Sequence, residues 1–514
     1  MSVTAAPKGE RPNILLITSD QQRADCFGFE GRNIKTPHLD LLARQGTRFS
    51  ACITPNVVCQ PSRASILTGM YPATHGVSDN GIDLPAATGT AGFAGLLANA
   101  GYATGMIGKA HFATYLSFAP TGSPECIDSS ADFPPPWNGP YMGFGRADLM
   151  LLGHNYWLPF KGPRGLQYER WYHADGMGDE KNRLYAGQAA RTPTPQTFHS
   201  QLPAAWHNST WIGDRTIDFM RAHRDRPFCA WASFPDPHHP FDAPEPWSRL
   251  HHPDEVDLPR ERTRDFDRRP WWHRASVETV PNLTGDLLKM RSEFSRIPVL
   301  ADAQLRELIA NYYGMISLID HNVGRVLIEL RDLGLADNTI VIYTSDHGDW
   351  LGDHGLVLKG PMMYDGLLRV GLIARGPGIA PDRVVHHPVS TVDLFSTITD
   401  YARVDAAPHD SRTLRPLLEG DGGRDFAYNE WDLRAGRVGV ALDLRTVRTR
   451  RHRLTHEVNS DAGELYDLQE DPLEMVNRFD DPGHRAIRRE LQDMIASQND
   501  ARRVKPVLPV VGTA

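Results

Sequence analysis

The sequence predicts an α/β protein with a large, mostly parallel central sheet flanked by helices and a smaller C-terminal domain that contains an antiparallel sheet. Three observations predict this fold class. Apolar strand-like runs alternate with amphipathic helix-like runs, as in doubly wound sheets. Polar clusters follow several predicted strands, where open α/β sheets build ligand sites. Beyond about residue 420, short strand-like runs precede a helix. We therefore expect domains over residues 1–420 and 421–514.

The alternation can be followed along the chain. Residues 12–20 (PNILLITSD) are a predicted buried strand, and residues 36–50 have the apolar spacing of a helix that stops at Gly46. TAGFAGLLANAGYATGMIGKAHF repeats this pattern, and RPFCAWASFPDPHHPF is a strand that ends in histidines. Residues 302–335 predict a long amphipathic helix, which leads into a strand over 338–349.

Two segments break the pattern, and a third predicts the small domain. Residues from about 120 to 200 and from about 245 to 300 are weakly periodic and rich in Pro, Gly, Trp and Arg. Loops of this length are usually functional, so we expect them to wall a substrate pocket. The runs DFAYNEW, VGVALDLRTVRT and HRLTHEV predict the antiparallel strands, and HRAIRRELQDMIASQ predicts the terminal helix.

The composition excludes several classes of protein. With 40% hydrophobic and 23% charged residues, the chain is too apolar for a disordered protein, and it lacks an apolar run near the roughly 20 residues of a membrane span. A net charge of -8 argues against nucleic acid as a partner. The N-terminus has no apolar core of a secretory signal, and the five cysteines are an odd number. We therefore expect reduced thiols in a cytoplasmic enzyme without a membrane partner.

Two predicted strand ends carry candidate metal ligands. Asp20 with Gln21, and Asp346 with His347, offer two carboxylates, an amide oxygen and an imidazole. Oxygen-rich sets of this kind suit Ca²⁺, Mg²⁺ or Mn²⁺ better than Zn²⁺. The alternative is that each aspartate caps the helix that follows its strand.

Further charged residues suggest anion binding and proton transfer. Arg63, Lys109 and Lys359 are candidate anion binders, although most lysines and arginines are solvated surface charges. His111 and His238 are candidate proton carriers, with an ordinary hydrogen-bonded role as the alternative.

One short stretch, VVCQPSRASILTG, sets a lone cysteine before a predicted helix. Taken alone, Cys59 is a buried thiol beside a helix capped by Ser62. However, Cys59-Gln60-Pro61-Ser62-Arg63, continuing to Thr68-Gly69, resembles the signature of type I sulfatases. The same resemblance holds, in the expected order and over nearly the whole chain, for the stretches NIKTPHLDLLARQGTRF, GYATGMIGKAHF, FPDPHHPF, YTSDHGDWLGDHGLVLKGPMMYDGLLRVGLI and GELYDLQEDPLEMVNRF.

The resemblance implies a fold similar to alkaline phosphatase and a role for each candidate residue. A formylglycine-generating enzyme would oxidise Cys59 to formylglycine, the nucleophile, which also faces the metal. One divalent cation, usually calcium and manganese in some relatives, would be held by Asp20, Gln21, Asp346 and His347. The remaining roles are as follows: Arg63 and Lys109 would hold the nucleophile and its charge, His111 would assist breakdown of the intermediate, His238 and Lys359 would face the leaving oxygen, and Asn80 would bind substrate together with Lys109, His238 and Lys359.

Two positions depart from the common sulfatase pattern. Many sulfatases have Asp-Asp where this chain has Asp20-Gln21, and Asp-Asn where it has Asp346-His347. Both replacements resemble the branch of phosphonate monoester hydrolases, and the lower anionic count favours manganese. In contrast, Lys109 and His111 keep the sulfatase Lys-x-His pattern.

We therefore expect arylsulfatase-like hydrolysis of sulfate monoesters, with side activity on phosphonate monoesters and phosphodiesters. The alternatives are a phosphonate monoester hydrolase or phosphodiesterase with the same nucleophile, and a catalytically silent binding protein. The tail ARRVKPVLPVVGTA is too short to fold alone, and we expect it to embrace a neighbouring subunit of a homo-oligomer.

Overall fold

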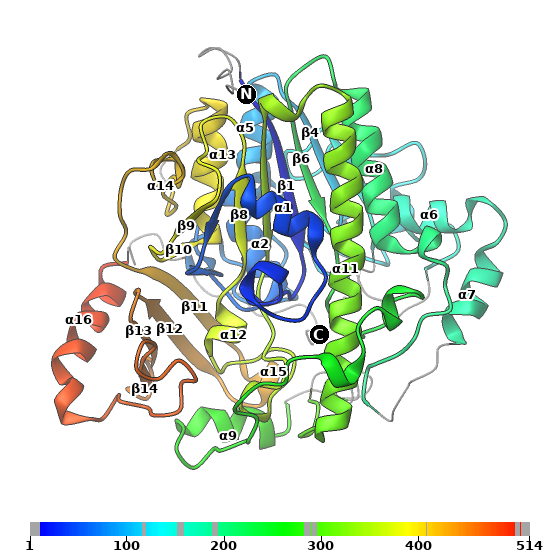
Figure 1. The fold of residues 1–514 in the computed structure, drawn as a ribbon. Coiled ribbons are helices and arrows are strands. Elements are labelled where there is room, and N and C mark those ends of the chain that lie inside the picture. Colours follow the sequence, from blue (N-terminus) through cyan, green and yellow to red (C-terminus); the bar gives the residue numbers. More distant parts are fainter. Residues whose placement is uncertain are drawn as a thin grey trace.

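The computed structural model of the chain describes residues 11–115, 120–151, 159–187, 194–281, 288, 296–407, 409–498 and 504 (Figure 1). Apart from Val504, the predicted tail lies outside the described residues, so its role in an oligomer stays a prediction. Within the described part of the chain, every helix is too short or too polar to cross a membrane.

The strands form a large sheet, a small sheet and a two-stranded pair. Their bounds are β1 Asn13–Ser19, β2 Thr47–Phe49, β3 Cys52–Ile53, β4 Ala103–Gly108, β5 Arg146–Leu149, β6 Phe228–Ser233, β7 Thr339–Ser345, β8 Leu372–Arg375, β9 Arg383–Val385, β10 Val389–Ser390, β11 Ala427–Leu433, β12 Leu442–Arg448, β13 His452–Glu457 and β14 Ala462–Asp467.

The helices connect these strands and cover the sheets. Their bounds are α1 Pro37–Arg44, α2 Cys59–Thr68, α3 Pro72–His75, α4 Ala86–Thr90, α5 Phe93–Asn99, α6 Gln167–Ala174, α7 Gly178–Ala186, α8 Asn208–Ala222, α9 Trp271–Glu278, α11 Asp302–Asp332, α12 Asp365–Leu368, α13 Leu394–Ala402, α14 Arg415–Glu419, α15 Ala435–Val438 and α16 Arg485–Ala496.

The large sheet has the order β5-β4-β6-β1-β7-β8-β2-β9. Strands β5, β4, β6, β1 and β7 pair in parallel, and β8 runs antiparallel to both of its neighbours. The predicted, mostly parallel sheet is therefore confirmed. Strand β1 lies between β6 and β7, so the carboxyl ends of these strands meet at one edge, as expected for a ligand site in an open α/β sheet.

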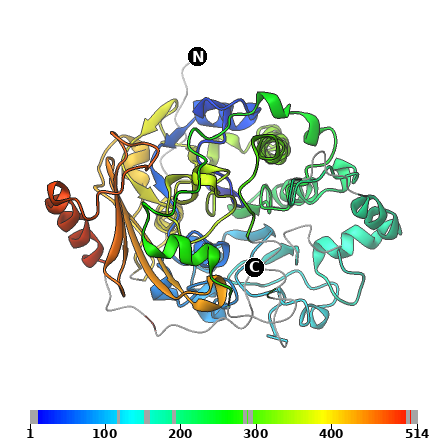
Figure 2. The same ribbon diagram turned by 90° about the horizontal axis from the view of Figure 1, so that it is seen from below.

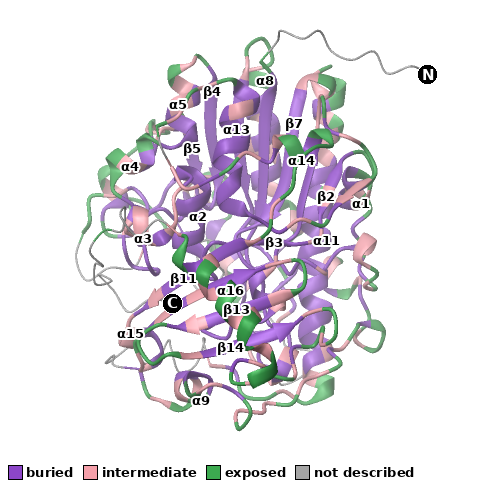
Figure 3. Cartoon of the chain, turned by 90° about the vertical axis from the view of Figure 1, so that its left-hand side faces the viewer, coloured by how far each residue is buried: buried purple, intermediate pink, exposed green. Residues whose placement is uncertain are grey.

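Helices cover both faces of this sheet, and the alternation of side chains along each strand separates the two cores. On β1, Ile14 and Leu16 face a core that includes residues of α2, α5 and α13. Leu15 and Ile17 face a second core that includes residues of α1, α8 and α11. Because both faces are covered, the central strands are mostly apolar and fully buried, and Figure 3 shows their burial.

The C-terminal strands form a separate antiparallel sheet of order β11-β12-β13-β14, with α16 packed outside it (Figure 2). This confirms the predicted small sheet and terminal helix, and the exact boundary at residue 420 stays a prediction. Strand β11 also contacts the segment before α2. The Glu430 amide donates to the Pro55 carbonyl at 3.0 Å, and the Asn56 side chain donates to the Glu430 carbonyl at 2.7 Å.

Two local interpretations of the sequence are corrected by the structure. The segment from 120 to 200 is more regular than its weak periodicity suggested, because it contains β5, α6 and α7. Its pattern is hidden because β5 is a short edge strand. Ser62 does not cap α2, since the helix begins at Cys59 and the Ser62 hydroxyl donates instead to the Asp346 carbonyl at 2.7 Å.

The junction between β11 and the segment before α2 predicts a stability effect. Asn56 is buried, and it both donates to Glu430 and accepts from the Val58 amide at 2.9 Å. Asn56→Ala leaves these buried groups unpaired, so we expect the free energy of unfolding to fall by about 1–3 kcal/mol in denaturant titrations.

The control is Asn33→Ala. Asn33 is exposed although it makes a similar bond to the Glu255 carbonyl, so the change is expected to stay within about 0.5 kcal/mol. Equal stability of the two variants would contradict a structural role for the Asn56 junction.

Candidate active site

Two strand ends supply the acidic side chains of the site. Ser19 and Ser345 are paired in the parallel register of β1 and β7, so Asp20 and Asp346 leave the sheet side by side. Both carboxylates are fully buried. One Asp346 oxygen accepts the amides of Gln21 at 3.1 Å and His347 at 2.9 Å, which fixes its orientation.

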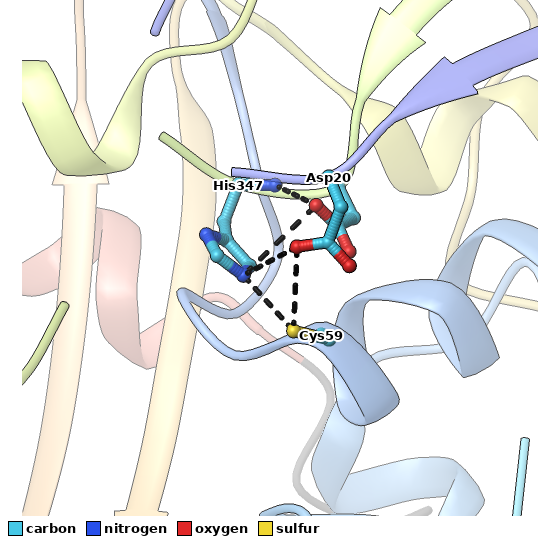
Figure 4. Close-up of side chains that lie close together, drawn as sticks. Asp20, Cys59 and His347 are labelled. Carbon is cyan, nitrogen blue, oxygen red and sulfur yellow. Dashed lines mark hydrogen bonds and ion pairs between the residues drawn. The ribbon is translucent and has the colours of Figure 1, made fainter. Parts of the chain in front are cut away.

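Helix α2 brings Cys59 to these strand ends. Cys59 is the first residue of the helix, and its Sγ lies 3.6 Å from an Asp20 oxygen and 3.2 Å from His347 Nε2 (Figure 4). Lys359 Nζ lies 3.1 Å from the same sulfur. Burial and Asp20 raise the pKa of the thiol, but Lys109, Lys359 and His347 outweigh them, and the pKa lies below its usual value. The thiol therefore lies next to a lysine ammonium group and next to side chains that can coordinate a metal ion.

Arg63, one turn further along α2, holds the two strand ends together. Its Nε donates to Asp346 at 2.9 Å, and Nη2 lies 3.4 Å from Asp20. Nη1 donates to the Ser233 hydroxyl at 2.7 Å and to the Lys109 carbonyl at 2.8 Å. The guanidinium is fully buried, so it neutralises two carboxylates and also links β4 and β6 to the site.

The end of β4 contributes Lys109 and His111. Lys109 Nζ donates to the same Asp20 oxygen that faces Arg63, at 2.6 Å. Burial, Lys109 and Arg63 hold the pKa of His111 well below its usual value, so its imidazole is neutral. Its Nδ1 is buried and has no hydrogen-bond partner among the described residues. The neutral ring therefore has one nitrogen without a hydrogen bond to any described residue.

Glu125 fixes the turn that carries His111, a function that the sequence analysis missed. His111 has a left-handed backbone conformation, with φ 54°. The buried Glu125 carboxylate accepts the amides of His111, Phe112 and Ala113 at 2.5, 3.0 and 3.2 Å, and the Tyr141 hydroxyl at 2.5 Å. No motif marked Glu125, because it lies in the weakly periodic segment and acts through backbone groups.

Lys359 and His238 form a pair on the other side of Cys59. Lys359 Nζ lies 3.0 Å from His238 Nε2 and 3.2 Å from the Gln21 side-chain oxygen. His238 Nδ1 lies 2.7 Å from the His239 carbonyl, which only accepts, so Nδ1 carries the proton and Nε2 accepts from Lys359. The pair can deliver a proton to a group bound next to Cys59.

Asp349 is a second residue that the sequence analysis did not assign. One of its oxygens accepts the Gln21 side-chain amide at 2.6 Å, and the other accepts the amides of Leu351 and Leu358 at 2.6 and 2.9 Å. It therefore orients Gln21 and anchors the chain just before Lys359. Its place in the stretch YTSDHGDW was the available signal.

The donor set fits a divalent cation. Ligand atoms of Asp20, Cys59, Asp346 and His347 all lie within 4.8 Å of one another. His347 Nδ1 lies 2.9 Å from the Gly348 carbonyl and so carries a proton. Its Nε2 faces the Asp20 and Asp346 oxygens at 3.7 and 3.9 Å and lies 3.2 Å from Lys359 Nζ, so the imidazole points toward the same position as the two carboxylates. Metal-bound histidines show the same arrangement, with the second nitrogen donating to a carbonyl.

The predicted residues thus converge, and several alternatives are excluded. In the described structure, Asp20 and Asp346 do not cap a helix. Arg63 and Lys109 are buried rather than solvated, and Lys359 is half-buried. Asn80 lies beside α2, where its side-chain oxygen accepts the Gln60 amide at 3.0 Å. It therefore supports the start of the helix, and substrate binding by Asn80 stays a prediction.

Comparison with known proteins gives consistent matches. The family model described as Sulfatase matches residues 12–404, and one described as N-sulphoglucosamine sulphohydrolase, C-terminal, matches residues 352–501. An arylsulfatase of Clostridium perfringens is 28% identical over 491 residues, which cover 91% of this chain and 90% of that protein. The Escherichia coli protein named uncharacterized sulfatase YidJ is 27% identical over 497 residues, 96% of this chain and 88% of that protein. Among solved structures, the phosphonate monoester hydrolase of Agrobacterium radiobacter matches with a TM-score of 0.75 at 26% identity, covering 96% of each chain.

The cation site predicts a metal-binding defect. Asp346→Asn keeps the shape of the side chain but removes one of the two carboxylate charges at the site. Because changes to groups behind a metal ligand already cost 10–100-fold in affinity, we expect loss of a ligand to weaken binding by about 100-fold or more. Calorimetric titration with Ca²⁺ and, separately, Mn²⁺ measures this and ranks the two ions.

Asp254→Asn is the matched control, since it removes the same charge from an exposed residue. It is expected to bind metal like the unmodified protein. Unchanged affinity in Asp346→Asn would refute its assignment as a ligand.

Proposed function

The chain belongs to the sulfatase family of the alkaline phosphatase superfamily, and we propose that it hydrolyses sulfate monoesters, aryl sulfates in particular, to sulfate and an alcohol or phenol. The observation that carries this proposal is the setting of Cys59. The cysteine of the Cys-x-Pro-x-Arg motif starts a buried helix and faces both a candidate metal site and a set of cations.

Two groups complete the proposed site. Formylglycine, made from Cys59 by a formylglycine-generating enzyme, supplies a hydrated aldehyde as a nucleophile that is regenerated after each turnover. The divalent cation supplies charge neutralisation and lowers the pKa of a bound hydroxyl. Calcium is the ion that the family resemblance implies, and the His347 imidazole makes manganese its competitor, because imidazole ligands suit transition metals better.

The cations of the chain itself bind the sulfate group. Lys359 lies 3.1 Å from Cys59 Sγ, Lys109 donates to Asp20, and Arg63 donates to Asp346. Charge-assisted hydrogen bonds to a tetrahedral anion are strong in a site that excludes water. The two carboxylates keep Arg63 and Lys109 in place before substrate arrives, and Gln21 and His238 hold Lys359, so the site is organised in advance.

Proton transfer is divided between two histidines. His111 is neutral and has a buried nitrogen without a partner, so it can accept the proton released when the intermediate breaks down. His238, paired with Lys359, lies where a leaving oxygen would develop negative charge. Lys359 supplies the proton or the positive charge, and His238 holds its ammonium group in place.

Phosphonate monoesters and phosphodiesters are the proposed side substrates, and a dedicated phosphonate hydrolase is the alternative. A similar arrangement of charges binds any tetrahedral oxyanion, and the fold closely matches a phosphonate monoester hydrolase. Gln21 and His347 resemble the pattern of that branch, whereas Lys109 and His111 resemble the sulfatase pattern and favour sulfate. A silent binding protein is a less suitable explanation, because it has no need for a buried, neutral histidine beside buried ion pairs.

The proposed location is the cytoplasm. The five cysteines are buried and free, which fits a reducing compartment. The negative net charge fits an enzyme with a small-molecule substrate rather than nucleic acid.

We also propose a homo-oligomer joined through the C-terminal tail. A tail-deleted protein that elutes at a smaller size from a sizing column would support this proposal, and one of unchanged size would refute it.

Matched kinetics test the main proposal. With protein produced alongside the formylglycine-generating enzyme, we expect kcat/KM for 4-nitrophenyl sulfate to exceed that for 4-nitrophenyl phenylphosphonate by about tenfold or more, because Lys109 and His111 follow the sulfatase pattern. A preference for the phosphonate would establish the alternative.

Two controls accompany these kinetics. Cys59→Ala is expected to abolish both activities, which excludes a contaminating hydrolase. Mass analysis of the peptide that contains Cys59 is expected to show conversion of the thiol to the aldehyde. An unmodified thiol together with no turnover would support a catalytically silent binding protein.

The hydrogen bonds of Glu125 to the amides of residues 111–113 predict that Glu125 positions His111 for catalysis. Glu125→Gln replaces one of two acceptor oxygens with a donor, so the turn of residues 111–113 loses hydrogen bonds and His111 moves. Since general acid–base catalysis contributes 10²–10⁴-fold, we expect kcat to fall by about tenfold or more, with a smaller change in KM.

Tyr141→Phe is the control for this variant, because it removes a single hydrogen bond from the same carboxylate and leaves the three backbone bonds intact. Its kcat is expected to stay nearly unchanged. A Glu125→Gln protein that folds normally and keeps its full kcat would show that these hydrogen bonds have no part in turnover.

A further inference from the structure

A cavity of about 220 Å³ shares one lining residue, Lys359, with the proposed active site. Lys359 lines it together with Gly360, Pro361 and Met362, and Trp350 and Val438 add an apolar surface. A further wall comes from the segment that was expected to wall a substrate pocket and includes Arg264, Ser276 and Arg296. Because Lys359 Nζ lies 3.1 Å from Cys59 Sγ, Lys359 connects this cavity to the position proposed for the sulfate group.

Two arginines of this wall have no carboxylate partner among the described residues. Arg264 Nη2 donates to the carbonyls of Gly355 at 2.9 Å and Ile297 at 3.3 Å, and its buried Nε has no hydrogen-bond partner. Arg296 Nη2 donates to the carbonyls of Ser276 and Val438, both at 3.1 Å. Burial lowers the pKa of both guanidinium groups, and no described acid counteracts it.

Other arginines in buried surroundings have the carboxylate partner that Arg264 and Arg296 lack among the described residues. Arg437 lines the same cavity, but it is paired with the Asp79 carboxylate at 2.6 Å. Arg63 pairs with Asp20 and Asp346. Removing a guanidinium from water is costly unless an anion compensates it, so half-buried arginines that contact only carbonyl groups are suited to an anion from outside the chain.

We infer that Arg264 and Arg296 bind a second anionic group of the substrate, a carboxylate or a second sulfate, on the leaving-group side of the sulfate ester. The inference rests on the proposed function, because it places the scissile sulfate at Cys59. It narrows the substrate class from aryl sulfates in general to sulfate esters whose alcohol portion is itself an anion. The planar forks of two arginines match the geometry of either oxyanion.

The apolar part of the cavity fits the same class of substrate. Trp350 and Met362 provide a surface for a ring or a carbon chain of the substrate. The lining therefore combines Lys359, an apolar surface, and the guanidinium groups of Arg264 and Arg296. A neutral aryl sulfate uses the first two features and leaves the arginines without a partner.

Paired substrates test the inference. The acid and the matching neutral amide are compared as 4-carboxyphenyl and 4-carbamoylphenyl sulfate, and again as the corresponding biphenyl sulfates, which carry the group one ring further out. We expect kcat/KM for an acid to exceed that for its amide by about tenfold or more in at least one pair. Phenylene disulfates are compared in the same way, to test a second sulfate in place of the carboxylate. The anionic group that raises kcat/KM more is the one that the arginines bind better.

Variants locate the preference. Arg264→Met and Arg296→Met keep an unbranched apolar chain but remove the charge, and each is expected to bring the ratio of acid to amide close to one while turnover of the amide persists. Arg268→Met is the matched control, because Arg268 is exposed and does not line the cavity, and it is expected to keep the wild-type ratio.

The outcomes separate the two proposals. Turnover of amides and acids at equal rates by the unaltered enzyme would overturn the inference and leave the proposed function standing. Absence of turnover for all sulfate esters would instead overturn the proposed function. The wild-type ratio depends on no variant, and the two arginines are tested independently, so a variant that fails to fold does not prevent a decision.

Discussion

The buried guanidinium of Arg63 is the interaction on which the rest of the site depends. It joins the ends of β1 and β7 through Asp20 and Asp346, and it reaches the ends of β4 and β6 through the Lys109 carbonyl and the Ser233 hydroxyl. Two buried carboxylates side by side would repel each other, and removing a charge from water is costly. Arg63 compensates both carboxylates at once, and because it lies on α2 it also fixes Cys59 against them.

This arrangement makes α2 unusual among the helices of the chain. All of its residues are buried, so its position is determined from every side rather than by one apolar stripe. The large sheet holds it through Arg63 and Ser62, and the C-terminal sheet holds the segment before it through Asn56. The smaller sheet thereby contributes to the site without supplying any of the reacting groups.

The centre and its surroundings have different physical requirements. The centre needs balanced charge, because its acids and bases are buried, and the geometry of Asp20, Arg63 and Lys109 meets that need within the chain. The cavity beside Lys359 is less balanced, since among the described residues Arg264 and Arg296 donate to carbonyl groups and to no carboxylate. The charges around Cys59 are paired within the chain, whereas those of Arg264 and Arg296 are left for a ligand. This difference is expected of an enzyme whose substrate carries a second anionic group.

The sequence by itself predicted the α/β class and the small antiparallel sheet, because apolar periodicity is local. It predicted the candidate site residues through short motifs that resemble those of sulfatases. It also predicted that Asp20 and Asp346 meet, since parallel strands end at one edge of a sheet. The tertiary structure alone decided the rest. Glu125 and Asp349 act through backbone amides and a side-chain amide brought together by folding, and no local pattern encodes such contacts. Likewise, that Arg264 and Arg296 have no carboxylate partner in the described part of the chain is a property of the space around them, which only the folded chain defines.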